Sequence, residues 1–236
     1  MADKPAMSTG ALIPQPLTLE TPEHLHREQC ESLLTRVNYC DYVKTMVYRY
    51  VIVAAVCVVI WVINGRHIAQ SAKRGLINDV YAHIGLGIFF TLLTLEYTLG
   101  GTEIWKQWHI SWLRILGFAL YAPSAILVFG SIIQLHRKGQ AEQESALSEY
   151  GTTAVIDSGV YRLVQHPMWL GMIIWSIGII LVSQSIPGIV MGVVAANLFR
   201  MAAIKERGFN IKKFGEPYRR YINNVPMWNI FTGLKK

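Results

Sequence analysis

Long apolar runs separated by short polar segments dominate the pattern of this chain. The run from Val51 to Ile63 contains no polar side chain, and four further runs of similar character follow. Because a helix that crosses the ~30 Å hydrocarbon core of a bilayer needs roughly 20 mostly apolar residues, such runs predict membrane-spanning helices. The pattern predicts an all-α fold, a polytopic membrane helical bundle of about five transmembrane helices, at residues 47–64, 80–99, 112–135, 168–183 and 187–205.

The last two predicted helices are joined only by SQSIPG, so they form a C-terminal helical hairpin with Pro187 in the first turn of the second helix. Lys and Arg favour the cytoplasmic side of a membrane. The segment after Arg200 carries eight of them and the hairpin loop carries none, so we expect a cytoplasmic-side tail. With five spans, residues 66–74 and 136–167 share the side of the tail, and the N-terminus lies opposite. If the first run only lies in the interface, the N-terminus returns to the side of the tail.

Three regions follow from this pattern. Residues 1–45 form a polar N-terminal arm, expected to be flexible with one short helix around residues 24–38. Residues 46–111 hold the first two membrane helices, and residues 112–236 hold the membrane core and the C-terminal tail.

The composition agrees with a membrane protein, since 52% of the residues are hydrophobic and 16% are charged. The net charge of +7 could indicate nucleic acid, but the basic residues lie beside apolar runs, where attraction to anionic lipid headgroups explains them. We therefore expect no nucleic-acid partner. The three cysteines are widely spaced and one lies in an apolar run, so neither a disulfide framework nor a metal site is predicted.

Polar residues gather just before the fourth apolar run, in the segment GVYRLVQHPMWLG, and again at the end of the fifth. Each of them has an ordinary structural explanation when it is taken singly. His166 suits an N-terminal helix cap, and Arg200 suits a side chain that snorkels to lipid phosphate. Glu206 suits an ion pair with Lys205 or Arg162.

The aromatic residues Tyr161 and Trp169, taken singly, suit the aromatic belt at the membrane surface. The hairpin nevertheless makes the last two helices neighbours, so the polar residues before Met168 should meet those after Asn197. A carboxylate, a cation and a histidine held together at the lipid boundary predict a polar pocket that opens to water and to the bilayer. Such a pocket suits a reaction between a soluble cofactor and a lipid.

The two polar segments, SGVYRLVQHPMWLG and KERGFNIKKFGEPYRRYINNVP, resemble the two motifs of the isoprenylcysteine carboxyl methyltransferase and phospholipid methyltransferase group of integral-membrane enzymes. The resemblance runs from the third span to Pro226. It implies that the motifs fold over S-adenosylmethionine and that a membrane lipid or lipidated substrate enters sideways between helices. The implied reaction is attack by a carboxylate, amine or thiolate on the sulfonium methyl group. The matching positions are Gly159, Tyr161, Arg162, His166, Pro167, Trp169 and Gly171, and then Glu206, Phe214, Gly215, Tyr218, Tyr221, Val225 and Pro226.

The resemblance and the polar pattern together give a candidate site. Arg200 and Glu206 are the candidate catalytic residues. His166, His136 and Glu206 are candidate proton acceptors, and the sequence does not choose among them. The candidate cofactor-binding residues are Tyr161, Arg162, Gln165, His166, Pro167, Glu206 and Tyr218.

Two positions depart from the family pattern. Gln165 stands where Arg is usual and Arg207 stands where a second Glu is usual, so one cation is lost and one anion is inverted. A Gln still donates hydrogen bonds, so the geometry can survive while the electrostatic attraction weakens. Two alternatives stay open: a catalytically silent subunit that joins a larger membrane complex through the N-terminal arm, and a membrane sterol-type reductase that uses NADPH.

Overall fold

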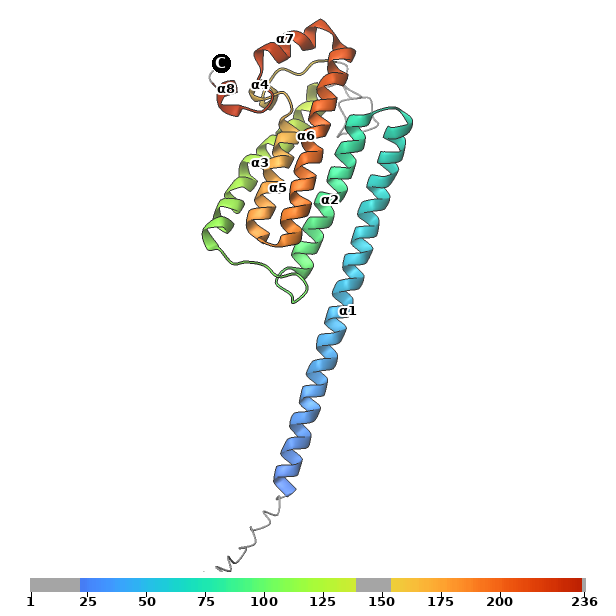
Figure 1. The fold of residues 1–236 in the computed structure, drawn as a ribbon, viewed down its shortest axis with the longest axis vertical. Helices are drawn as coiled ribbons and strands as arrows, with labels where there is room; N and C mark the ends of the chain where they lie inside the picture. Colours follow the sequence, from blue (N-terminus) through green and yellow to red (C-terminus); the bar gives the residue numbers. More distant parts are fainter. Residues whose placement is uncertain (1–21, 139–153, 235–236) are drawn as a thin grey trace, which may run out of the picture. The chain divides into compact units, whose positions relative to one another are not determined.

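All regular secondary structure is helical in residues 22–138 and 154–234, which the computed structural model describes. The predicted all-α fold is therefore confirmed. The chain divides into two units, residues 1–48 and residues 49–236. The helices are α1 (Pro22–Lys73), α2 (Ile77–Leu99), α3 (Ser111–Lys138), α4 (Val160–Leu163), α5 (Pro167–Ser183), α6 (Ile186–Phe214), α7 (Glu216–Asn224) and α8 (Ile230–Leu234) (Figure 1).

Helix α1 is longer than the short helix that the sequence predicts for this part of the chain. It begins at Pro22 and continues without a break to Lys73, so the short helix expected around residues 24–38 is part of the first membrane helix. The physical reason is the absence of Gly and Pro between Glu23 and Asn64, because these two residue types are the ones that interrupt helices most strongly. Residues 1–21 of the predicted arm lie outside the described residues. A docking role for the arm stays a prediction.

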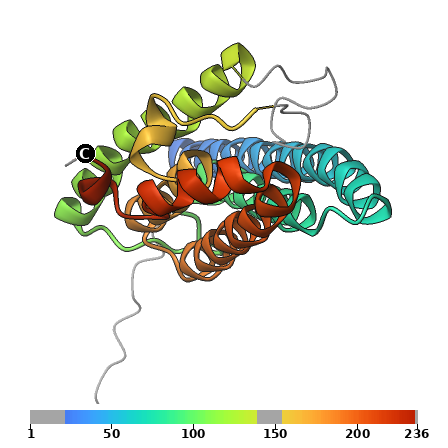
Figure 2. The same ribbon diagram turned by 90° about the horizontal axis from the view of Figure 1, so that it is seen from above.

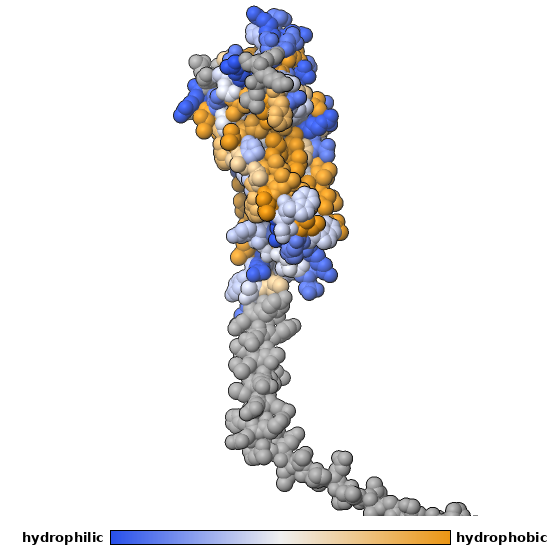
Figure 3. Space-filling model, turned by 90° about the vertical axis from the view of Figure 1, so that its left-hand side faces the viewer, coloured by the Kyte–Doolittle hydropathy of each residue, from blue (hydrophilic) through white to orange (hydrophobic). Residues whose placement is uncertain are grey.

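The predicted membrane helices are all present. Within residues 22–138 and 154–234, four segments are long and apolar enough to cross a membrane: Lys44–Lys73, Ile77–Leu99, Ser111–Arg137 and Ile186–Phe214. Helix α5 is apolar but has only 17 residues, which is about 26 Å at 1.5 Å per residue. Figure 3 shows the apolar side chains as a band with hydrophilic side chains at both ends. The protein is an integral, multi-pass membrane protein.

Helix α5 lies between α3 and α6, and α6 lies between α5 and α2 (Figure 1). Glycine permits the close approach of α3 and α5, since a Cβ atom on Gly171 would lie 3.0 Å from the carbonyl oxygen of Ser124. The Ser124 hydroxyl donates a hydrogen bond of 2.8 Å to the Gly171 carbonyl oxygen. Between α2 and α6, the rings of Phe89 and Phe199 are fully buried, with centroids 6.2 Å apart. The core thus surrounds α5, which begins at the first polar segment, and α6, which ends in the second.

The α5–α6 hairpin has the form that the sequence predicts. Helix α5 ends at Ser183, Gln184 adopts a left-handed conformation with φ of 50°, and Ser185 caps α6. The backbone N–H of Gly188 donates a 2.9 Å hydrogen bond to the Ser185 hydroxyl oxygen, and Pro187 lies in the first helical turn. We call this end of the bundle the hairpin end.

Hydrogen bonds clamp the hairpin end to the segment between α2 and α3. The Glu96 carboxylate of α2 accepts hydrogen bonds from the Ser185 hydroxyl and, at 2.7 Å, from the Gln107 amide. The Gln184 side chain pairs with the backbone of Ile110 in both directions, at 2.8 and 2.9 Å. The turn between α5 and α6 is therefore held both to α2 and to the segment that precedes α3.

The opposite end of the bundle, which we call the tail end, carries α4, α7 and α8 (Figure 1). Viewed along the helices, α7 lies across this end (Figure 2). The turn between α1 and α2, with Lys73 and Arg74, lies at the same end (Figure 1). The basic residues of the α1–α2 turn and of the tail thus lie at the same end of the bundle, as the distribution of Lys and Arg along the sequence predicts.

Candidate functional site

The two polar segments meet at the tail end, as the hairpin predicts. The Tyr221 hydroxyl of α7 donates a 2.7 Å hydrogen bond to the Tyr161 carbonyl oxygen of α4. The backbone N–H of Gln165 donates to the Pro226 carbonyl oxygen at 3.0 Å, and its side-chain amide donates to the Val225 carbonyl oxygen at 2.6 Å. The link between α4 and α5 is thus fixed to the chain that follows α7.

Three side chains form a buried polar cluster at the start of α5, which we call the His–Glu–Trp cluster. The indole N–H of Trp169 donates a hydrogen bond to Oε2 of Glu206 on α6. The other carboxylate oxygen, Oε1, lies 3.7 Å from Nδ1 of His166. The exposed fractions are 2% for His166, 3% for Glu206 and 6% for Trp169. A buried carboxylate is stable only when such partners compensate for its lost hydration. Glu206 therefore links the second polar segment to the first inside the core.

The cluster corrects the explanations that apply to its members singly. His166 occupies the N-cap position of α5, but its side chain makes no capping hydrogen bond. Glu206 lies beside His166 and Trp169, whereas the side chains of Lys205 and Arg162 are exposed.

Trp169 and Tyr161 are also buried, at 6% and 4% exposure, so neither belongs to a surface aromatic belt. Trp169 stacks on Phe199, with ring centroids 6.0 Å apart and planes at 15°. Tyr161 packs with Leu135 and Ile156. In both cases, tertiary packing turns inward a residue that its sequence position would place at the membrane surface.

Arg200 does not join the cluster. It is exposed, on the same outward stripe of α6 as Asn197 and Ile204. Glu206 follows six positions later on α6, which places the two side chains about 120° apart around the helix. This position fits an Arg that snorkels to the headgroup region. His136, at the end of α3, is exposed as well.

A small internal cavity of about 20 Å³ lies at Gln165, the residue that precedes His166 of the cluster. Sequence reasoning picked out Tyr161, Gln165 and Tyr218 among its lining residues, but missed Asn210, which is 1% exposed. Asn210 lies four residues after Glu206, on the same face of α6, and that spacing was the available signal. A cavity of this size is about large enough for one water molecule. The expected pocket open to both water and bilayer is therefore not formed by the cluster itself.

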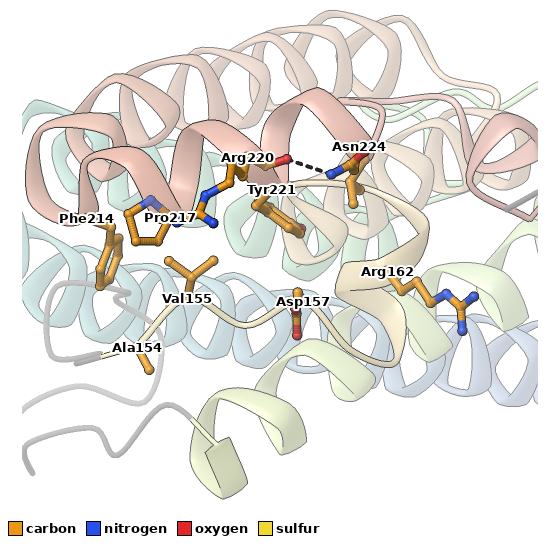
Figure 4. A pocket seen from close by; sticks show the side chains of 10 residues that line it. Ala154, Val155, Asp157, Arg162, Phe214, Pro217, Arg220, Tyr221 and Asn224 are labelled. Carbon is orange, nitrogen blue, oxygen red and sulfur yellow. Dashed lines mark hydrogen bonds between the residues drawn. The ribbon is translucent and has the colours of Figure 1, made fainter.

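A larger, open groove of about 710 Å³ adjoins the cavity. Both share Phe214 and Tyr221 as lining residues. Figure 4 shows Asp157 and Arg162 on one wall of the groove, and Arg220 on α7 on the other. The guanidinium group of Arg162 extends away from the other labelled side chains (Figure 4). A lining that carries both signs of charge suits a zwitterionic ligand. Of these charged residues, sequence reasoning named Arg162 and missed the other two, because no motif marks them.

The two departures from the family pattern occupy different surroundings. Gln165 is 4% exposed, and its amide donates to the carbonyl oxygens of Val225 and, at 3.3 Å, of Ile222. The expectation that this Gln still donates hydrogen bonds is confirmed, and its acceptors lie at the C-terminal end of α7. Arg207 is half-buried, and its Nε has no hydrogen-bond partner among residues 22–138 and 154–234.

Comparisons with known proteins match the region that forms this site. Residues 112–217 match the family model described as phospholipid methyltransferase. The chain is similar to protein-S-isoprenylcysteine O-methyltransferase of Mus musculus, with 28% identity over 153 residues that cover 61% of this chain and 54% of the relative. The Homo sapiens protein of the same name is 26% identical over 159 residues, with the same coverage, and that of Schizosaccharomyces pombe is 25% identical over 116 residues, covering 46% of this chain and 49% of the relative. The chain spans about half the length of the curated relatives it matches. No solved structure matches it.

Proposed function

Because residues 112–217 match the family model described as phospholipid methyltransferase, we propose that the protein transfers a methyl group from S-adenosylmethionine to a lipid or lipidated acceptor in the membrane. The observation that carries the proposal is the His–Glu–Trp cluster, which ties the two matched motifs together beside a cavity and an open groove. The relatives are methyltransferases by name, which favours methyl transfer over the sterol-type reductase.

The open groove fits S-adenosylmethionine in size and in chemistry. Its volume of about 710 Å³ lies in the range of small-molecule sites, roughly 300–1,000 Å³. Arg220 would hold the carboxylate of the methionine part, which Arg162 would reach only by a change of rotamer. Asp157 would accept hydrogen bonds from the ammonium group or from the ribose. Phe214 and Tyr221 offer aromatic faces to the adenine.

The cluster would act by positioning. Once bound, S-adenosylmethionine supplies a methyl group already activated by the sulfonium, so the protein has mainly to align the acceptor in line with it. Glu206 fixes His166 and Trp169 on either side of Pro167, and thereby holds Gln165 at the small cavity. We therefore propose Glu206 and His166 as positioning residues, and Tyr161, Arg162, Gln165 and Tyr218 as residues that face the cofactor.

The acceptor that we propose is a prenylcysteine carboxylate. The names of the relatives specify an isoprenylcysteine as acceptor and an oxygen as the methylated atom. A carboxylate oxygen would use a lone pair to form the O–CH₃ bond while the S–CH₃ bond breaks, and the sulfur would leave as a neutral thioether. No proton moves in this step, so no general base is required. An amine acceptor would need one, and because His136 is exposed, His166 or Glu206 of the cluster would have to supply it.

Calorimetry of the detergent-solubilised protein with S-adenosylmethionine tests the proposal, followed by transfer of a labelled methyl group to N-acetyl-farnesylcysteine. We expect binding and an ester product. His166→Ala and Glu206→Gln should each weaken binding by at least about tenfold, or 1.4 kcal/mol. Lys205→Gln is the matched control, because Lys205 neighbours Glu206 in sequence but is exposed.

Two results would contradict the proposal. If the native protein binds no S-adenosylmethionine, the chain is a non-enzymatic subunit, and Gln165 and Arg207 mark a site that has been given up. If binding is normal in both cluster variants, the cluster is a structural feature of the core and the cofactor lies elsewhere.

A further inference from the structure

Gln165 lines the small cavity with a hydrogen-bond acceptor that the protein itself does not use. The residue is 4% exposed, and its side-chain oxygen has no donor among residues 22–138 and 154–234. Its amide nitrogen is committed elsewhere, because it donates to the carbonyl oxygens of Val225, at 2.6 Å, and Ile222, at 3.3 Å. Since a carbonyl oxygen can only accept, these two bonds also fix which side-chain atom is the nitrogen. The buried oxygen therefore needs a donor from an occupant of the cavity.

The cavity suits a single small, neutral donor. Its volume of about 20 Å³ matches one water molecule or one amino group. None of the described residues that line it carries a charged side chain, and most are apolar or aromatic. An ammonium group would lose its hydration there without gaining a counter-charge, which is costly. A neutral N–H group meets the need of the Gln165 oxygen without this cost.

The cavity adjoins one end of the open groove. The residues that line both spaces are Ala154, Val155, Phe214 and Tyr221. Asp157 and Arg162 line the groove alone, and Figure 4 shows Phe214 and Arg162 at its two ends. An adenine ring that stacks on Phe214 and Tyr221 therefore lies at the mouth of the cavity. Its ribose and methionine parts would extend toward the charged side chains.

We infer that Gln165 accepts a hydrogen bond from the 6-amino group of the adenine of S-adenosylmethionine, and that the small cavity is the subsite for this group. The inference rests on the proposed function and adds the residue that selects the base. The amino group is neutral, has about the size of a water molecule and carries the N–H that the Gln165 oxygen needs. A base with a 6-oxo group would set one acceptor against another. Gln165 could not reverse its amide without giving up both bonds to the end of α7.

This selection is a property of this chain and not of the family pattern, in which Arg is usual at position 165. A guanidinium group donates hydrogen bonds but accepts none. An Arg could keep the bonds to the carbonyl oxygens of Val225 and Ile222, but it would present a donor to the cavity. The exchange of Arg for Gln therefore reverses the hydrogen-bonding polarity of the subsite and leaves its attachment to α7 intact. Family members with Arg need a different acceptor for the adenine.

Calorimetry of the detergent-solubilised protein with two probes tests this inference without turnover. The probes are S-adenosylhomocysteine and S-inosylhomocysteine, in which the base carries a 6-amino or a 6-oxo group. We expect the native protein to bind the inosyl probe at least about tenfold more weakly, because a site built around an N–H donor rejects an analogue that lacks it. This comparison needs no substitution, so it decides the question even if a variant fails to fold.

Two variants test the side chain itself. Gln165→Arg should reverse the preference, so that the inosyl probe binds more tightly than the adenosyl probe. Ile156→Val is the matched control, because Ile156 also lines the cavity but its side chain has no hydrogen-bonding group, and this variant should keep the native preference. Melting temperatures verify that both variants are folded. If Gln165→Arg keeps the native preference, another group reads the base and the inference is wrong.

The outcomes separate this inference from the proposed function. A native protein that binds both probes with equal affinity and methylates its acceptor would refute this inference alone, and Gln165 would then serve a buried water molecule. A native protein that binds neither probe would refute the proposed function, and this inference with it.

Discussion

Replacing Trp169 by Phe isolates the contribution of one hydrogen bond in the His–Glu–Trp cluster. Phe keeps an aromatic ring against Phe199, whose centroid lies 6.0 Å away, but it removes the indole N–H that Glu206 accepts. Since Glu206 is only 3% exposed, water cannot easily replace the lost donor. The carboxylate would keep His166, at 3.7 Å, as its remaining partner in the cluster.

The expected size follows from this geometry. A hydrogen bond to a charged group contributes about 1.5–3 kcal/mol to the free energy of unfolding. For a chain of 150–250 residues, each kcal/mol shifts the melting temperature by roughly 2–4 °C, so the bond corresponds to roughly 3–12 °C. The smaller Phe ring adds a packing loss, which a control variant can subtract.

Trp175→Phe provides that control. Trp175 lies in the same helix and packs against Phe89, with ring centroids 5.7 Å apart, but its indole nitrogen has no hydrogen-bond partner among the described residues. Thermal unfolding of both variants in one detergent, followed by circular dichroism, measures the difference. If the two variants melt at the same temperature, the indole does not stabilise the buried carboxylate and our reasoning about the cluster is wrong.

Other predictions concern packing, the tail and the topology. Gly171→Ala should destabilise the protein by about 1–3 kcal/mol, because the methyl group would meet the α3 backbone, whereas Gly208→Ala, with open space around it, should stabilise α6 by about 0.5–1 kcal/mol; equal melting temperatures would contradict the close α3–α5 contact. Gln165→Leu should cost about 1–3 kcal/mol by leaving carbonyl groups at the end of α7 without their donor, and Gln165→Arg should restore most of it in the same unfolding assay. Single cysteines at Lys73 and Lys212 should react with an impermeant thiol reagent from the same side of the membrane, and labelling from opposite sides would exclude a shared tail end.

The sequence was sufficient for the membrane helices and the hairpin because hydrocarbon imposes length and apolarity on each helix independently of the rest of the fold. It was less informative for residues 22–45, where polar composition suggested a flexible arm. The more useful signal there was the absence of Gly and Pro up to Asn64, which lets α1 continue through a polar segment.

The candidate site was predictable only in part. The resemblance brought the two motifs together correctly, but whether Trp169 or Glu206 points into the core depends on how α5 and α6 pack. Arg200 shows the limit most clearly, because it lies in the same stretch of α6 as Glu206 and yet faces outward. The role of Asp157 and Arg220 in the open groove depends on how α7 folds over the end of the bundle, which no local pattern encodes.

The clamp at the hairpin end determines where the bundle can open. Glu96, Ser185 and Gln107 are joined there by side-chain hydrogen bonds, and Gln184 is joined to Ile110, so separating the helices at that end would break several bonds at once. The open groove lies at the other end. A motion that admits or releases a ligand would therefore be a hinge, with the clamp as its pivot and the largest displacement at α4. In such a lever, a small tilt of the helices is enough to widen the open groove while their far ends stay in register.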